Sequence, residues 1–166
     1  MDSQTLRNRC VSSAVSRSTC RTPRGLVLAP TRELANQISD VLTPLADAYG
    51  MAVTTVYGGV KYERQFRALD AGADIVVACP GRLEDLIEQQ ALTLADVRIV
   101  VLDEADEMAD MGFFRRSNAF SSRFDRMRSI CCSRPRSIMA VDEVVSEFLH
   151  DPKVHSVDEV TSNAIR

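Results

Sequence analysis

The chain has 166 residues, of which 45% are hydrophobic and 26% charged, and its formal net charge is −3. This length suits one globular domain and excludes two domains of ordinary size. No apolar run approaches the roughly 18 residues of a membrane span, and the first residues contain no apolar signal-peptide core. We therefore expect a cytoplasmic protein without a membrane anchor. The five cysteines include no CxxC pair, which argues against a zinc site and favours a reducing compartment.

The net charge is the balance of four segments that differ in sign. Residues 1–24 contain five arginines and one aspartate, and residues 115–140 contain seven arginines and one aspartate. Residues 25–114 contain 15 acidic and 6 basic residues, and residues 141–166 contain 6 acidic and 2 basic residues. The two basic segments show no helical or strand periodicity. We interpret them as poorly folded, divergent chain, with nucleic-acid binding as the alternative.

Between residues 25 and 114, short apolar runs alternate with helical patterns. Runs of this kind are typical of strands that are buried on both faces of a parallel sheet, and we expect four of them at residues 25–29, 52–57, 75–78 and 99–102. An apolar stripe after the first strand predicts a helix with Thr31 as N-cap and Gly50 as C-cap. Pro44 lies inside that stripe, so we expect it to kink or interrupt the helix.

Two further helices are predicted between the later strands. The second covers residues 61–69 and ends near Gly72, and the third starts at Pro80 and buries Leu83, Leu86 and Ile87. Repeated strand–helix–strand units with right-handed crossovers predict an α/β fold with a doubly wound, mostly parallel sheet.

Ligands of doubly wound sheets bind beyond the carboxyl ends of the strands. The first three predicted strands run into Pro30-Thr31-Arg32, Gly58-Gly59 and Pro80-Gly81-Arg82. Helix N-termini offer free backbone N–H groups, arginines add charged contacts, and glycines permit close approach. Each group alone is typical of a turn, but together, on successive strands, they predict contacts to a phosphate backbone.

The fourth predicted strand runs into Asp103-Glu104-Ala105-Asp106. Three carboxylates this close repel one another, and a cation such as Mg²⁺ would relieve the repulsion. The alternative is a solvated acidic helix start, which the helix dipole favours.

These four strand ends carry a resemblance to a known family. The segments PTRELA (30–35), GG (58–59), PGR (80–82) and VLDEAD (101–106) resemble the DEAD-box ATP-dependent RNA helicases. The resemblance covers residues 25–114, and residues 141–159 resemble the end of that family's first RecA-like domain. It implies an incomplete RecA-like domain of the P-loop NTPase type. We expect a divergent basic segment (1–24), the domain core (25–114), a divergent basic insert (115–140) and the end of the domain (141–166).

The resemblance also implies ligands and residue roles. RNA would be bound weakly through its backbone by Pro30, Thr31, Arg32, Gly58, Gly59, Pro80, Gly81 and Arg82. ATP and Mg²⁺ are the implied cofactors: Asp103 would hold Mg²⁺ through water, and Glu104 would help to position or activate the attacking water. Asp106 would link the nucleotide side to the RNA side. Cys79 is a departure, since the family usually has Thr at this position.

Several of the family's functional segments are not found in these residues. A phosphate loop needs Gly-Lys followed by Ser or Thr, but the only lysines, Lys61 and Lys153, follow Val and Pro. Residues 136–140 stand where the family has Ser-Ala-Thr, and the remaining length cannot hold a second RecA-like domain. We therefore predict a helicase fragment that is inactive alone.

Alternatives to this prediction are a non-catalytic RNA-binding or regulatory module and, less well matched, a flavodoxin-like receiver. Two compensating frame shifts would explain why the length is kept while residues 115–140 lose the family's sequence. Because no strand precedes residue 25, we also expect an unpaired sheet edge beside residues 25–29 and poor stability.

Overall fold

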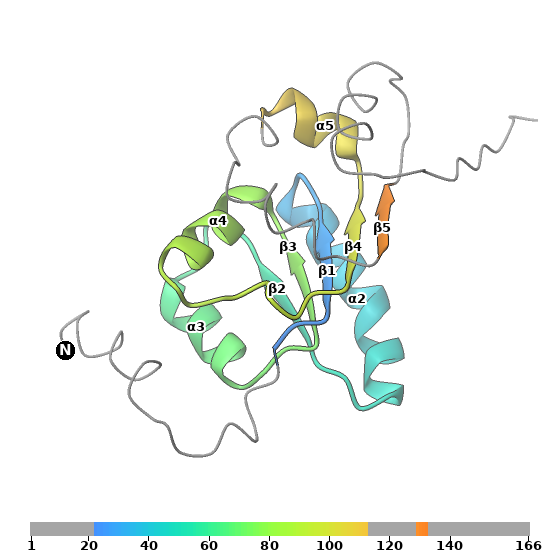
Figure 1. Cartoon of the computed structure of the whole chain (residues 1–166), viewed down its shortest axis with the longest axis vertical. Coiled ribbons are helices and arrows are strands. Elements are labelled where there is room, and N and C mark those ends of the chain that lie inside the picture. Colours follow the sequence, from blue (N-terminus) through green and yellow to red (C-terminus); the bar gives the residue numbers. More distant parts are fainter. Residues whose placement is uncertain (1–21, 113–128, 133–166) are drawn as a thin grey trace, which may run out of the picture.

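A computed structural model of the chain describes residues 22–112 and 129–132. Its centre is a parallel sheet of five strands in the order β2-β3-β1-β4-β5, and Figure 1 shows all the arrows pointing the same way. The strands are β1 (Gly25–Leu28), β2 (Val53–Val56), β3 (Ile75–Ala78), β4 (Ile99–Leu102) and β5 (Ser129–Cys132). The four predicted strands are thus confirmed to within one residue at each end.

Helices α2 (Arg32–Ala48), α3 (Tyr62–Asp70), α4 (Pro80–Glu88) and α5 (Ala105–Asp110) connect or follow the strands. The Thr31 hydroxyl accepts a hydrogen bond from the Leu34 N–H (3.3 Å), which confirms Thr31 as the N-cap of α2. Gly50 lies one residue beyond the C-cap, Tyr49, and its φ of +66° gives the left-handed turn that glycine permits. Pro80 occupies the first turn of α4, as predicted.

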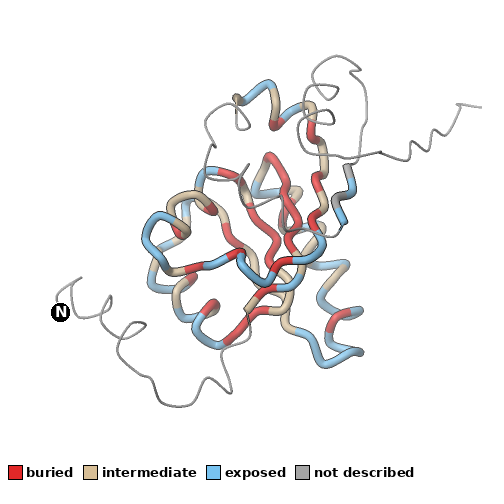
Figure 2. The backbone as a smooth tube through the Cα atoms, viewed as in Figure 1, coloured by how far each residue is buried: buried red, intermediate tan, exposed pale blue. Residues whose placement is uncertain are grey.

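The two faces of the sheet are covered by different helices. Alternate strand residues Leu26, Leu28, Val76 and Val100 pack in one cluster with the apolar side chains of α3, α4 and α5. The intervening side chains of Val27 and Val77 pack on the other face against α2. Figure 2 shows the result as buried strands between largely exposed helix surfaces. Burial on both faces explains why the inner strands β1, β3 and β4 are almost uninterruptedly apolar.

The expected unpaired edge beside residues 25–29 is wrong. β1 pairs in register with β3 on one side and with β4 on the other, so it lies inside the sheet. The prediction failed because it placed a missing strand next to β1, whereas the chain itself supplies β4 as that neighbour.

The basic segment at residues 115–140 contains an unpredicted strand. β5 pairs in parallel with β4, from Ile99 opposite Ser129 to Leu102 opposite Cys132. A run of four residues is too short to give a periodic signal, and only its pairing with β4 identifies it as a strand. The predictions for residues 1–21, for the Ser-Ala-Thr position at 136–140 and for 141–166 lie outside the described residues.

Pro44 does not interrupt its helix. α2 runs continuously for 17 residues with Pro44 inside it. Proline removes the hydrogen bond to the carbonyl of residue 40, but Asp40 and Pro44 are both exposed, so water can take that place. In the part of the chain that is described, none of the helices has the length and hydropathy needed to cross a bilayer.

Candidate nucleic-acid and metal-binding edge

The carboxyl ends of β1 to β4 lie at one level. Leu28 pairs with both Ala78 and Leu102, and Val56 pairs with Ala78. Backbone hydrogen bonds continue one residue further: Ala29 N–H donates to Ala78 (3.0 Å), Cys79 N–H to Val56 (2.8 Å) and Asp103 N–H to Leu28 (3.0 Å). The groups that follow the four strands therefore emerge side by side, as the sequence predicted.

Strand order separates two kinds of chemistry along this edge. The three segments with Gly and Arg follow β2, β3 and β1, which are neighbours in the sheet. The acidic segment follows β4, on the other side of β1. The segments predicted to contact phosphate and the segment predicted to bind a cation thus share one edge, and the segment after β1 lies between the other two groups.

The segment after β1 offers Arg32 to solvent. Arg32 is exposed and forms an ion pair with Glu33 (3.0 Å). The pKa of Glu33 is lowered, first by a hydrogen bond from its own backbone N–H and then by the Arg32 side chain. The Arg32 side chain also approaches the loop after β2. A Cβ atom added at Gly59 would lie 3.5 Å from Arg32 Nη1. Pro30, in contrast, is buried.

The loop after β2 presents bare backbone. Gly58 and Gly59 are exposed, and Gly59 has a φ of +79° that side chains rarely adopt. Within residues 22–112 and 129–132, no protein atom accepts a hydrogen bond from either glycine N–H. Two free donors without side chains over them suit an anionic oxygen.

The segment after β3 uses its side chains differently. Pro80 is buried and Gly81 is exposed, whereas Arg82 is turned inward with only 10% of its side chain exposed. Cys79 is the N-cap of α4, but its thiol makes no capping hydrogen bond. Burial, and then the charge of Glu33, raise the pKa of Cys79 to about 11, so it is a protonated thiol at neutral pH.

The acidic segment after β4 is electrostatically strained. Glu104 has a left-handed φ of +51°, a conformation that non-glycine residues rarely adopt. Desolvation raises the pKa of Glu104, followed by a hydrogen bond with Glu107 and the charges of Glu107, Asp103 and Asp106. Asp106 has one buried carboxylate oxygen without a hydrogen-bond partner among the described residues. A bound cation would relieve this crowding of negative charge.

These carboxylates do not form a closed metal cage. No group of three His, Cys, Asp or Glu side chains in the described residues is arranged to hold a metal ion directly. Mg²⁺ commonly keeps several waters and uses only one or two carboxylates, so the chemistry of this segment is compatible with the water-mediated contact predicted for Asp103, which stays a prediction.

Two side chains that pack beside this edge were not singled out by the sequence analysis. Gln65 is 4% exposed and donates to the Tyr57 carbonyl (2.8 Å), and Tyr62 donates to Asp85 (2.8 Å). Gln65 shares a helix face with Tyr62, Phe66 and Leu69, at the spacing of an apolar stripe. A glutamine on that stripe was the available signal of a buried polar contact.

Comparisons with curated proteins find RNA helicases. The chain is 37% identical over 143 residues to the RNA helicase CrhR of Synechocystis, covering 86% of this chain and 29% of that protein. It is 45% identical over 130 residues to DEAD-box ATP-dependent RNA helicase 5 of Arabidopsis thaliana, covering 78% of this chain and 24% of that protein. The chain therefore spans about a quarter to a third of these two relatives.

Solved structures show the same fold. A hypothetical ATP-dependent RNA helicase from Sulfolobus tokodaii matches with a TM-score of 0.72 and 31% identity, over 79% of this chain and 39% of that one. The yeast DEAD-box splicing factor Prp28 matches with a TM-score of 0.71 and 29% identity, over 78% and 32%. The sheet and its helices are thus a RecA-like domain of the DEAD-box kind.

The match to the family is not confined to the four strand ends. The family model described as DEAD/DEAH box helicase matches residues 8–141, which include most of the first basic segment and the whole of the second. This match covers most of the chain. It agrees with the strand order, with the register of the strand ends and with the relatives above. The chain belongs to the DEAD/DEAH box helicase family.

Proposed function

We propose that this chain binds the backbone of single-stranded RNA through the loops after β1, β2 and β3. The observation that carries the proposal is the alignment of these three loops on neighbouring strands. The contacts we assign are the two glycine N–H groups of the loop after β2, Arg32, and the N-terminal turns at Thr31 and Gly81. Backbone contacts of this kind give affinity with little sequence preference.

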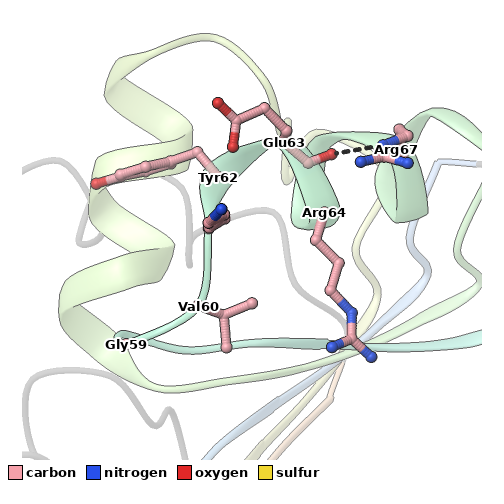
Figure 3. Close-up of a pocket in the computed structure, with 7 residues that line it drawn as sticks. Gly59, Val60, Tyr62, Glu63, Arg64 and Arg67 are labelled. Carbon is pink, nitrogen blue, oxygen red and sulfur yellow. Dashed lines mark hydrogen bonds between the residues drawn. The ribbon is translucent and has the colours of Figure 1, made fainter.

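The charge near the loop after β2 favours a polyanion such as RNA as the partner. The described core is acidic overall, yet Lys61, Arg64 and Arg67 lie at the start of or within α3, which follows the loop after β2. These three residues line an open pocket together with Gly59 and Glu63. Figure 3 shows Arg64, Arg67 and Glu63 on α3 and Gly59 in the loop that precedes it. Arg32 approaches the same loop from α2. A polyanion would be attracted to this cationic region.

RNA binding is tested by fluorescence anisotropy of a labelled oligouridine at several salt concentrations. We expect micromolar affinity at low salt that falls steeply as salt rises. Arg32→Gln should weaken binding and reduce the salt slope by about 0.7, which corresponds to one phosphate contact on a single strand. Arg98→Gln is the matched control, because Arg98 is an exposed arginine at the opposite, amino end of β4. Absence of binding at low salt would refute the proposal.

For ATP, we propose that this chain of 166 residues does not hydrolyse it at a useful rate. Asp103 and Glu104 provide carboxylates suited to hydrated Mg²⁺, which would neutralise phosphate charge. However, the sequence has no Gly-Lys pair to reach the β- and γ-phosphates. Phosphoryl transfer depends almost wholly on positioning and charge stabilisation, so losing that lysine removes a large part of catalysis.

Hydrolysis is tested by phosphate release with saturating ATP, Mg²⁺ and oligouridine. We expect no rate above the buffer background. RNA-stimulated release that disappears in Glu104→Gln would overturn this proposal while leaving the RNA-binding proposal intact. That outcome would also assign Glu104 the role in water activation that the family resemblance implies.

A further inference from the structure

Arg82 lies in α4 but its guanidinium reaches the loop after β2. Its Nη1 donates to the Val60 carbonyl (2.9 Å) and to the Gln65 side-chain oxygen (3.0 Å). Only 10% of the Arg82 side chain is exposed. The guanidinium is therefore largely buried, and its Nη1 group links α4 to the loop after β2 and to Gln65.

Gln65 holds the other end of the loop after β2 by a hydrogen bond. Its amide Nε2 donates to the Tyr57 carbonyl (2.8 Å), while its oxygen accepts from Arg82. Tyr57 and Val60 flank Gly58 and Gly59 in the sequence. Both carbonyls that bracket the two glycines are thus held by side chains that also hold each other.

A tyrosine and an aspartate fix the guanidinium itself. The Arg82 Cζ lies 4.0 Å from the centroid of the Tyr62 ring, which places the cation over the ring face. The Tyr62 hydroxyl donates to Asp85 (2.8 Å), and Asp85 is 3.7 Å from Arg82 Nε. In Figure 3 the Tyr62 ring extends from the start of α3 across α4.

We propose that Arg82 and Gln65 are positioning residues that clamp the Gly58-Gly59 loop for RNA, and that Arg82 does not itself contact a phosphate. The inference rests on the proposed RNA-binding function for its purpose, but the clamp is a property of the free protein. Two consecutive glycines have the largest backbone freedom to lose on binding. Holding both flanking carbonyls removes much of that freedom before RNA arrives, and leaves the glycine N–H groups facing solvent.

The clamp is tested first without RNA, by ¹⁵N relaxation of the full chain. Backbone order parameters at Gly58 and Gly59 should be about 0.85 in the wild type and fall below about 0.6 in Gln65→Leu and Arg82→Lys. Gln89→Leu and Arg98→Lys are matched controls at exposed positions and should leave both values unchanged. Circular dichroism confirms that each variant is folded. Order parameters that stay high in the folded variants would overturn the clamp.

The second test separates positioning from phosphate contact by the salt dependence of RNA affinity. Gln65→Leu changes no charge, and we expect it to weaken binding about tenfold with an unchanged salt slope. Arg82→Gln should do the same, and the double variant should be no weaker than either single one, because both residues serve one clamp. If instead Arg82→Gln lowers the slope by about 0.7 and Gln65→Leu has no effect, Arg82 is a phosphate contact and the proposal fails.

The two tests also distinguish the clamp from the proposed function. If the wild type binds no RNA but the order parameters fall as expected, the RNA-binding proposal fails and the clamp stands as a structural device. If the wild type binds RNA and the order parameters do not respond, only the clamp is refuted.

Discussion

At the scale of single residues, Cys79 occupies a helix N-cap position that a hydroxyl side chain would stabilise more than a thiol does. It is the N-cap of α4, its backbone is extended, and no side-chain hydrogen bond caps the helix. A threonine hydroxyl accepts from the N–H groups of the first turn, which a thiol does poorly. We expect Cys79→Thr to raise the free energy of unfolding by about 0.5–1 kcal/mol, measured by urea denaturation.

Cys79→Ala is the control for this substitution. It removes the thiol without supplying a cap, so it should not reproduce the gain. A Cys79→Thr protein with an unchanged or lower urea midpoint would show that the half-buried site cannot seat the threonine methyl group.

Glu104 gives a pH-dependent prediction. Its pKa is raised in the folded protein above its ordinary value of 4.5, chiefly by desolvation and then by Glu107. The folded state therefore penalises the ionised form, and stability is lost as pH rises through 4.5 and beyond. Glu104→Gln removes the charge, so its Tm should exceed that of the wild type at pH 7, with the difference shrinking as pH falls towards 4.5.

Differential scanning calorimetry between pH 4.5 and 7 checks this expectation. Glu88→Gln, at an exposed carboxylate at the end of α4, is the control and should show no such trend. A Glu104→Gln protein that is less stable than the wild type at pH 7 would mean that the Glu104 carboxylate makes a net favourable contact.

Residue roles could be predicted from sequence only where they depend on local position. Thr31 as a cap and Pro80 in a first turn follow from near neighbours in the chain. The partners of Arg82 lie 17 and 22 residues away, and they are fixed by which strands become neighbours in the sheet. Arginine after Pro-Gly resembles a phosphate contact, and only the three-dimensional packing reveals that this side chain is largely buried, with its Nη1 bonded to Val60 and Gln65.

At the scale of elements, Pro44 inside α2 is a point of local weakness. The helix continues past it, but one backbone hydrogen bond within a 17-residue helix is lost. Pro44→Ala restores that bond at an exposed position, although the more flexible unfolded chain offsets part of the gain. We expect a net increase of about 1–2 kcal/mol in the free energy of unfolding.

Urea denaturation followed by the helical circular dichroism signal measures this change. Gln37→Ala, at another exposed site in α2, controls for helix propensity and should alter stability by only about 0.3 kcal/mol. A Pro44→Ala protein no more stable than this control would show that the helix geometry around residue 44 already accommodates the missing bond.

Element-level prediction succeeded where the pattern was long and failed where pairing decided the outcome. The helix around Leu34 and Ile38 and the apolar run at β3 have strong periodic or compositional signals. β5 has four residues in a basic, serine-rich segment. It forms a strand because it pairs with the side of β4 that β1 does not occupy. The position of β1 inside the sheet likewise follows from topology and not from its own residues.

At the scale of the whole molecule, the net charge conceals an uneven surface. The described core is acidic, yet Lys61 and Arg64 are exposed beside the Gly58-Gly59 loop and form no ion pair with another described residue. In Figure 3 the Arg64 side chain extends from α3 on the side of Val60. Unpaired cations in an acidic protein raise the local concentration of a polyanion near the candidate RNA site.

The double reversal Lys61→Glu/Arg64→Glu therefore tests whether this cationic region takes part in RNA binding. We expect affinity for oligouridine at low salt to fall by about tenfold or more, and the salt slope to decrease by about 1.4, as for two lost phosphate contacts. The difference from wild type should close as salt rises, because the lost term is electrostatic. Arg98→Glu, which adds negative charge at the amino end of β4, should change affinity far less. Equal losses in the two proteins would mean that RNA responds to net charge alone, and that the region around Gly59 has no special role.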